Sequence, residues 1–254
     1  MNEIFDRKLL QQNQARALPH LSQHNFLYHE IANRIVENLQ SFSRDFENCL
    51  EIGPRDGYLS SLMAQEKNIK NISQVEEESL PQQTESFDLI VSNLNLHHIN
   101  FVPQFLLQIK SLLKPRGMFI ASFFAEENLP ELHKTIFEVE SEIYNGISPR
   151  MIPTIDVKTA ANLLQKAGFV HPISNLERVE VSYIDPLNLL KDLKMMGQGN
   201  IMRQRSRRFF TRGFLQKVLE RYRQNYKGSG LGFENQPESV RATFEIVTIV
   251  GFKI

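Results

Sequence analysis

The sequence predicts an α/β fold with a mostly parallel, doubly wound sheet. Apolar strand-like runs alternate with helical stretches at a regular pitch, the first such run ends in a glycine turn, and neither a repeat nor a low-complexity linker interrupts the series. The chain has 254 residues, of which 41% are hydrophobic. That length is sufficient for one large core, so we expect a single α/β domain with additions.

The first half of the chain opens with an amphipathic helix and then alternates. Leu27, Ile31, Ile35 and Leu39 fall on one face at helical spacing within residues 25–42. The elements expected next are strand 48–53, helix 58–65, strand 86–94, helix 102–117 and strand 117–124. The fourth of these elements should be closed by Pro115 and Gly117, with Lys114 and Arg116 near its C-terminal end.

The second half should add helices and two further strands. Residues 177–184 alternate like a strand, and residues 241–254 form a long apolar final strand. The helices expected between and before them are 129–146, 156–169, 185–197 and 210–228.

Composition excludes several classes of protein. The formal net charge is +0, so no overall field draws the chain to nucleic acid or membrane. The single cysteine excludes an internal disulfide framework, and Cys49 opens an apolar run, as a buried core residue does. No signal peptide, organelle import leader or apolar run of about 18 residues is present. We therefore expect a cytoplasmic protein.

The stretch "EIGPRDG" is the first candidate binding site, because a strand that ends at a glycine turn before a helix is how open parallel sheets approach a nucleotide. Gly53 allows a close backbone approach, and Gly57 lets the helix begin tightly. Glu51 at the strand end suits a ligand with a cationic amino-acid tail better than a phosphate, and the loop has no P-loop "GK[ST]". Alone, this stretch could equally be a packing turn.

Later segments, in order, strengthen the binding interpretation: "VEEESLP", "SFDLIVSNLNLHHI" and "LKPRGMFIASFF". Together with the glycine turn they resemble class I S-adenosylmethionine-dependent methyltransferases, which implies a Rossmann-like sheet with a final antiparallel strand. The terminal strings "IFDRKLLQQNQARA", "VSYIDPLNLLKDLKMMGQGN" and "RATFEIVTIVGF" resemble one subgroup. That subgroup includes a respiratory complex I assembly factor, described as an arginine hydroxylase, and its alphaproteobacterial relatives. A malonyl-acyl-carrier-protein methyltransferase is more distantly related.

The resemblance implies S-adenosylmethionine as the cofactor and a set of residues that bind it. Glu51 would hold the methionine end, an acid at position 76 would face the adenine amino group, and Tyr28 would cover the site from the N-terminal helix. The full set of implied cofactor-binding residues is Glu51, Gly53, Arg55, Gly57, Glu76, Ser92, Asn93 and Tyr28.

Two departures from the family pattern predict a weakened site. Pro54 and Arg55 replace small residues in the loop, and proline fixes φ and removes a donor. The segment after the loop is also too short for a full second strand, helix and third strand, so the acid that grips the ribose hydroxyls is missing, unless Glu66 or another nearby acid replaces it. We expect a working site of reduced affinity rather than a relic.

Other candidates are weaker. His97 is a candidate for the substrate pocket and His98 for a structural contact, on opposite faces if strand geometry continues. Arg150 could bind a substrate carboxylate or form a structural ion pair. No metal site is expected, because Pro19 and Ser22 disfavour a continuous helix. The candidate ligands for an iron site would otherwise be His20, His24, His29 and Glu30.

The stretch Arg203–Lys227 carries nine basic residues against the single acid Glu220. It is either a solvated helix face or a docking surface for an acidic partner or a membrane. Its phenylalanines are explained by helix packing, so nucleic acid is not favoured. The interleaved aromatic residues are Phe209, Phe210 and Phe214.

These observations predict an enzyme of the methyltransferase fold that modifies a protein, such as a complex I subunit, by methylation or arginine hydroxylation. The alternatives are a non-catalytic assembly chaperone with the same fold and a carboxyl methyltransferase acting on malonyl-acyl-carrier protein. Residues 1–44 should form an N-terminal helical arm or lid, and residues 45–254 the methyltransferase-like domain of a bacterial, cytoplasmic protein.

Overall fold

The structure is a computed structural model, and it describes residues 3–76, 79–206, 211–228 and 238–254. The chain divides into two compact units. The sheet unit contains residues 25–125, 154–177 and 246–254, and the helical unit contains residues 1–24, 126–153 and 178–245. The boundary expected after residue 44 stays a prediction.

The sheet has six strands in the order β2-β1-β3-β4-β6-β5. Their bounds are β1 Phe46–Ile52, β2 Ile69–Val75, β3 Phe87–Ser92, β4 Leu113–Phe124, β5 Val170–Tyr183 and β6 Val240–Phe252. The first four strands pair in parallel, and β6 pairs antiparallel to β4. The expected mostly parallel sheet with a final antiparallel strand is confirmed. Because β2 and β3 lie on opposite sides of β1, the strand order reverses there, which is where open α/β sheets bind ligands.

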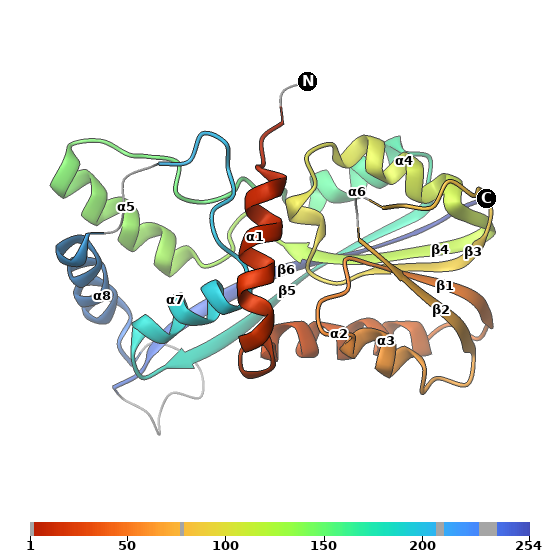
Figure 1. Cartoon of the computed structure of the whole chain (residues 1–254), viewed down its shortest axis with the longest axis horizontal. Coiled ribbons are helices and arrows are strands. Elements are labelled where there is room, and N and C mark those ends of the chain that lie inside the picture. Colours follow the sequence, from red (N-terminus) through yellow and green to blue (C-terminus); the bar gives the residue numbers. More distant parts are fainter. Residues whose placement is uncertain (1–2, 77–78, 207–210, 229–237) are drawn as a thin grey trace. The chain divides into compact units, whose positions relative to one another are not determined.

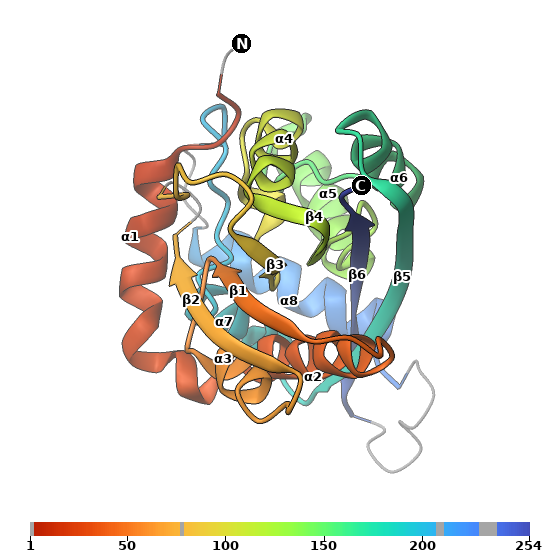
Figure 2. The same cartoon turned by 90° about the vertical axis from the view of Figure 1, so that its right-hand side faces the viewer.

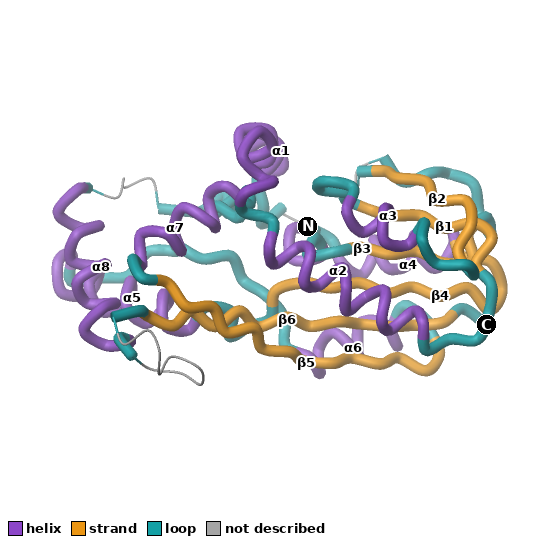
Figure 3. The backbone as a smooth tube through the Cα atoms, turned by 90° about the horizontal axis from the view of Figure 1, so that it is seen from below, coloured by secondary structure: helices purple, strands orange, loops and turns teal. Residues whose placement is uncertain are grey.

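Helices cover both faces of the sheet unit. Helices α4 (Val102–Leu112) and α6 (Val157–Lys166) lie on one face, and α2 (Phe26–Gln40) and α3 (Tyr58–Met63) lie on the other (Figures 1 and 2). Seen from below, α2 lies across the strands of this unit (Figure 3). Its expected apolar face is buried, with Leu27, Ile31, Ile35 and Leu39 each at most 1% exposed.

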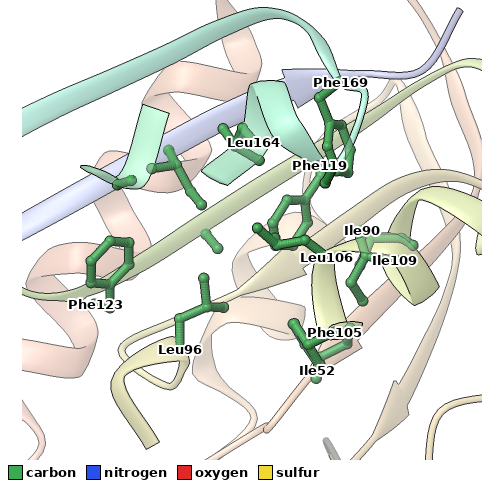
Figure 4. Packing of buried hydrophobic residues seen from close by; sticks show 14 of the residues in the cluster. Ile52, Ile90, Leu96, Phe105, Leu106, Ile109, Phe119, Phe123, Leu164 and Phe169 are labelled. Carbon is green, nitrogen blue, oxygen red and sulfur yellow. The ribbon is translucent and has the colours of Figure 1, made fainter. Parts of the chain in front are cut away.

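The main core of the sheet unit lies between the strands and the helices α4 and α6 (Figure 4). Ile52 and Ile90 come from neighbouring strands, and the ring of Phe119 lies 6.0 Å from that of Phe169, centroid to centroid. Burying one such side chain contributes about 1.5–3 kcal/mol, so this cluster fixes the strand ends that carry the site.

The helical unit contains α1 (Arg7–Ala17), η1 (Leu18–Gln23), α5 (Pro130–Tyr144), α7 (Pro186–Met195) and α8 (Arg212–Tyr226). Helix α5 packs against α8, and α7 packs against both α1 and α8. Among the described residues, no helix is both long and apolar enough to cross a bilayer.

Several expected boundaries were wrong for local reasons. Helix α4 ends at Leu112, not at Gly117, because the residue before Pro115 is restricted to extended backbone. Lys114 therefore lies in β4, where its ammonium pairs with Asp88 at 2.9 Å. Helix α8 begins at Arg212, and residue 210, where it was expected to begin, lies outside the described residues.

Candidate functional site

The site is built at the C-terminal end of β1, at the point where the strand order reverses. β1 ends at Ile52, and the glycine loop (residues 53–57) leads into α3. The amide of Gly53 donates to the carbonyl of Val75 at 2.8 Å, which ties the loop to β2. Gly53 and Gly57 have φ of +68° and +75°, which side chains rarely adopt, so the glycines expected from the sequence are required by the backbone.

A hollow of about 220 Å³, partly open to solvent, lies beside this loop. That volume includes open solvent, so the enclosed space is smaller than a typical small-molecule pocket of roughly 300–1,000 Å³. The lining residues are Tyr28, Glu51, Gly53, Arg55, Asp56, Tyr58, Leu59 and Asn93. Five of the predicted cofactor residues are therefore brought together here.

Glu51 places a carboxylate at the base of the hollow. The side chain is 3% exposed. One oxygen, Oε2, accepts hydrogen bonds from Gln74 Nε2 at 2.9 Å and from the hydroxyl of Ser60. The other oxygen, Oε1, accepts none from the described residues. A carboxylate oxygen that accepts no protein hydrogen bond and lines a hollow suits a ligand that brings a donor or a positive charge.

Tyr28 and Asn93 also line the hollow. Asn93 Nδ2 donates to the carbonyl of Tyr28 at 2.8 Å, and Asn93 Oδ1 accepts from the hydroxyl of Ser122 at 3.1 Å. The guanidinium carbon of Arg55 lies 5.4 Å from the ring centroid of Tyr28, within the range of a cation–π contact. Arg55 therefore forms part of the wall, and the lid role of Tyr28 stays a prediction.

Three predicted cofactor residues, Gly57, Ser92 and Glu76, do not line the hollow. The hydroxyl of Ser92 is buried and donates to the carbonyl of Ile52 at 3.0 Å, so it joins β3 to β1. Glu76 is exposed and follows β2 directly. The segment holds β2, with Glu76 directly after it, but no helix among its described residues before β3, so the unit is trimmed, which was one of the two alternatives. Glu66 lies before β2, where Gln40 donates to its carboxylate, and which acid meets the ribose stays a prediction.

The shortening of this segment lies after β2. Residues 76 and 79–86 form neither a helix nor a strand, and residues 77–78 lie outside the described part. β2 was missed because its sequence, "IKNISQV", is largely polar and occupies the edge of the sheet.

The two adjacent histidines do not point to opposite faces, as strand geometry had suggested. The backbone of Leu94 has φ of +48°, which ends the extended run, and residues Leu96–His98 form a 3-10 turn, η2. The rings of His97 and His98 lie 3.9 Å apart and are both buried. His97 is not among the residues that line the hollow. In the described part of the chain, no group of three or more metal-binding side chains is close enough to hold an ion.

Arg150 forms a structural ion pair, which was the alternative to binding a substrate carboxylate. It lies in the helical unit, where its Nη2 is 2.9 Å from Glu140 Oε1 and its guanidinium lies over the ring of Phe214. The two charged side chains are 7% and 1% exposed. Ser148 also donates to Glu140, so this arginine is committed to the interior of its unit.

The basic stretch is largely paired within the helical unit. Lys217 and Arg221 contact Glu142 on α5, and Arg223 contacts Asp185. These contacts favour the solvated helix face over a docking surface. Of the residues in this stretch, Arg207, Arg208, Phe209 and Phe210 lie outside the described residues.

Three residues that shape the loop could hardly be recognised from the sequence alone. Asn95 packs against Gly53, and the side chains of Asn25 and His29, from the start of α2, contact Asp56 in the glycine loop. Only the second asparagine in "SNLNL" hinted at Asn95. The contacts of Asp56 join segments 27 residues or more apart, which spacing alone cannot reveal.

A parallel sheet with a glycine loop and a buried carboxylate at its switch point defines a nucleotide-cofactor-binding α/β protein. Comparison with known sequences makes the class specific. The profile of the family described as "Methyltransferase domain" matches residues 22–171. The chain belongs to this methyltransferase domain family, and it is an S-adenosylmethionine-dependent methyltransferase-like enzyme.

Individual relatives agree with this assignment. The chain is 31% identical to the mouse (Mus musculus) protein named "Arginine-hydroxylase NDUFAF5, mitochondrial", over 98% of this chain and 77% of that protein. It is 31% identical to a putative methyltransferase from Rickettsia prowazekii, over 61% of this chain and 76% of that protein. A putative methyltransferase from Bacillus halodurans has the same fold, with a TM-score of 0.51 at 15% identity, over 87% of this chain and 97% of that one.

The residues at the loop fit the cofactor of this family. S-adenosylmethionine carries an ammonium group and a sulfonium, and the carboxylate of Glu51 has an oxygen available to such a group. Glu76 stands at the end of β2, about 20 residues after the glycine loop, where dinucleotide sites use an acid to bind ribose hydroxyls. The small volume of the hollow is the one feature that fits poorly, and the guanidinium of Arg55 contributes to it.

Proposed function

We propose that this enzyme binds S-adenosylmethionine at the glycine loop and modifies a side chain of a protein substrate during assembly of respiratory complex I. The observation that carries the site is the buried carboxylate of Glu51, whose Oε1 accepts no hydrogen bond from the described residues. The substrate class rests on the relative named as an arginine hydroxylase, which aligns with 98% of the chain.

In this proposal each polar group near the loop has a distinct task. Glu51 binds the ammonium of the methionine end, and Gln74 and Ser60 hold its carboxylate in place. Glu76 binds the ribose hydroxyls rather than the adenine. Arg55 faces the carboxylate of the methionine end, since a guanidinium can bind a carboxylate through two hydrogen bonds.

The bound cofactor supplies an activated methyl group, and the chain supplies position. Holding two reacting groups in line can account for much of the rate of a transfer reaction. Glu51 and Asp56 are already hydrogen-bonded to side chains, an arrangement that suits orientation better than proton transfer. Methylation and arginine hydroxylation of the protein substrate both remain within the proposal.

The committed pairing of Arg150 with Glu140 weighs against a malonyl substrate, because that arginine was the candidate for its carboxylate. The contact of Arg55 with Tyr28 favours the second candidate function, a chaperone whose hollow no longer admits the cofactor. The proposal also includes a domain division and a location. Residues 1–44 form an arm, residues 45–254 form the catalytic domain, and the protein is cytoplasmic in a bacterium.

Calorimetric titration with S-adenosylmethionine and S-adenosylhomocysteine tests the site. We expect binding in the micromolar range, weakened about tenfold by Glu51→Gln, which corresponds to about 1.4 kcal/mol. Glu37→Gln is the matched control, because Glu37 is exposed on α2. A folded protein that binds neither compound would refute the enzyme and favour the chaperone. If either compound binds, mass analysis of complex I subunits distinguishes the gain of a methyl group from the gain of an oxygen.

A further inference from the structure

Helix α2 holds the glycine loop through a cluster of side chains that the proposed chemistry does not use. Asp56 is the carboxylate of the loop. Its Oδ2 lies 2.8 Å from His29 Nε2 and 2.9 Å from Asn25 Nδ2. Its Oδ1 accepts from the backbone amide of Tyr58 at 3.1 Å, so every hydrogen bond of this carboxylate serves the loop or its junction with α2.

The nitrogen His29 Nε2 lies 2.8 Å from Asp56 Oδ2 and 2.8 Å from Asn25 Nδ2. An ionised carboxylate has only acceptors, so the contact with Asp56 is a hydrogen bond in the tautomer that carries the proton on Nε2. Burial disfavours the charged form of Asp56, but the hydrogen bonds from Asn25, His29 and the Tyr58 backbone outweigh it and lower the pKa of this carboxyl. The contact is therefore made by an ionised Asp56, and the side chains of His29 and Asp56 are only 32% and 22% exposed.

The same imidazole also packs against the start of α3. Its ring stacks on that of Tyr58 with the centroids 3.6 Å apart and the planes 13° from parallel. The hydroxyl of Tyr58 donates to Asn33 Oδ1 at 3.3 Å, which makes a second link to α2. Helices α2 and α3 lie side by side on one face of the sheet unit (Figures 1 and 2).

This cluster reaches the hollow directly, since Asp56 and Tyr58 both line it. The loop has a glycine with positive φ at each end, Gly53 and Gly57, and glycine leaves the backbone free to adopt other conformations as well. Contacts from outside the loop therefore restrict it to this conformation. We propose that His29 is a positioning residue, which keeps the glycine loop in its ligand-binding conformation through Asp56 and Tyr58. The ligand part of this inference rests on the proposed function.

Two variants separate the two contacts of the imidazole. His29→Phe keeps a flat ring for Tyr58 but removes the donor, and His29→Gln restores a donor that can reach Asp56. His20→Phe is the matched control, because His20 is exposed in η1. Amide hydrogen exchange of residues 53–58 is measured in the ligand-free protein, and calorimetric titration with S-adenosylhomocysteine measures affinity.

We expect about tenfold faster loop exchange and about tenfold weaker binding in His29→Phe, values typical of one lost charge-assisted hydrogen bond. His29→Gln should return both to within about threefold of the wild type, and His20→Phe should change neither. Unchanged loop exchange in His29→Phe, or faster exchange without weaker binding, would overturn the inference. A wild-type protein that binds no ligand, while its loop exchange still depends on His29, would refute the proposed function and would overturn the ligand role of the cluster too.

Discussion

The side-chain amide nitrogen of Asn95 lies 2.5 Å from the point that a Cβ atom at Gly53 would occupy. The carbon of the same amide lies 2.7 Å from that point. Both distances are shorter than real Cβ contacts, and Gly53 also has φ of +68°. Two independent constraints therefore require glycine at the start of the loop, and one of them comes from the segment that follows β3.

We predict that Gly53→Ala destabilises the protein by about 2–4 kcal/mol, from backbone strain and from the clash with Asn95. Gly57→Ala is the matched variant, since its φ is +75° but no atom lies within 4 Å of its Cβ position, so only the strain of about 1–2 kcal/mol should appear. Urea unfolding measures both. Adding Asn95→Ala should rescue part of Gly53→Ala; equal losses in the two glycine variants would show that the clash is unimportant.

The central strands and the helices that pack on them could be predicted from the sequence. The amphipathic spacing of Leu27 and Ile31 predicted α2, and the apolar run around Val91 predicted β3. α1 lies within the helical arm expected over residues 1–44, but its own bounds were not predicted because few of its residues are apolar, with only Leu10 and Ala17 buried. Edge positions and polar surface helices leave no strong hydrophobic period, so local pattern does not identify them.

Local pattern could predict the site only where its residues are close in the chain, whereas Tyr28 and Asn93, which also line the hollow, were expected from the family resemblance. Glu51 and Gly53 belong to one motif, and the structure brings both to the hollow. The geometry at His97 was misjudged because a positive φ at Leu94 turns the chain out of the strand, which the leucine itself does not indicate. The role of His97 in a substrate pocket stays a prediction. Contacts such as His29 to Asp56 depend on how α2 docks on the sheet unit, which is set by tertiary packing rather than local sequence.

We predict that Arg150→Met destabilises the protein by about 3–5 kcal/mol, because it leaves the carboxylate of Glu140 buried without its cation. Glu140→Gln in the same background should recover part of the loss. Arg221→Met is the control, since its pairs with Glu138 and Glu142 lie at the surface and should be worth about 1 kcal/mol or less. If Arg150 instead bound a substrate, its replacement would weaken substrate binding and leave the urea midpoint in place.

The pKa of His133 predicts a defined loss of stability in acid. Burial lowers this pKa from 6.5 to about 4, and the charge of Glu131 opposes the shift only in part. Between these values the unfolded chain binds a proton that the native state does not, so this contribution is complete above pH 6.5 and declines as the pH falls to about 4. It should amount to roughly 3 kcal/mol at 1.36 kcal/mol per unit.

Urea unfolding of the wild type and His133→Phe at pH 7 and pH 4.5 tests this sign. On acidification, the free energy of unfolding of the wild type should fall by about 2 kcal/mol more than that of the variant, because only the wild type has this histidine to protonate. His20→Phe should follow the wild type, because His20 is exposed. Parallel pH dependences in the wild type and His133→Phe would contradict the assignment.

Arg55 can either block the hollow or bind the cofactor, and the two roles predict opposite results. Its guanidinium lies over the ring of Tyr28 and lines the hollow, so a carboxylate at the methionine end of the ligand would meet a cation already held in place. We predict that Arg55→Ala weakens S-adenosylhomocysteine about tenfold, since a charge-assisted hydrogen bond is worth about 1.5–3 kcal/mol. The affinity for methylthioadenosine, which lacks the amino-acid end, should change by less than about twofold, because it has no group for the guanidinium to bind. Arg55→Lys keeps the positive charge but lacks the two-pronged guanidinium, so its affinity for S-adenosylhomocysteine should lie between those of the wild type and Arg55→Ala. Tighter binding of both compounds to Arg55→Ala would instead mean that the side chain obstructs the hollow, and the departure from a small loop residue would then account for a weakened site.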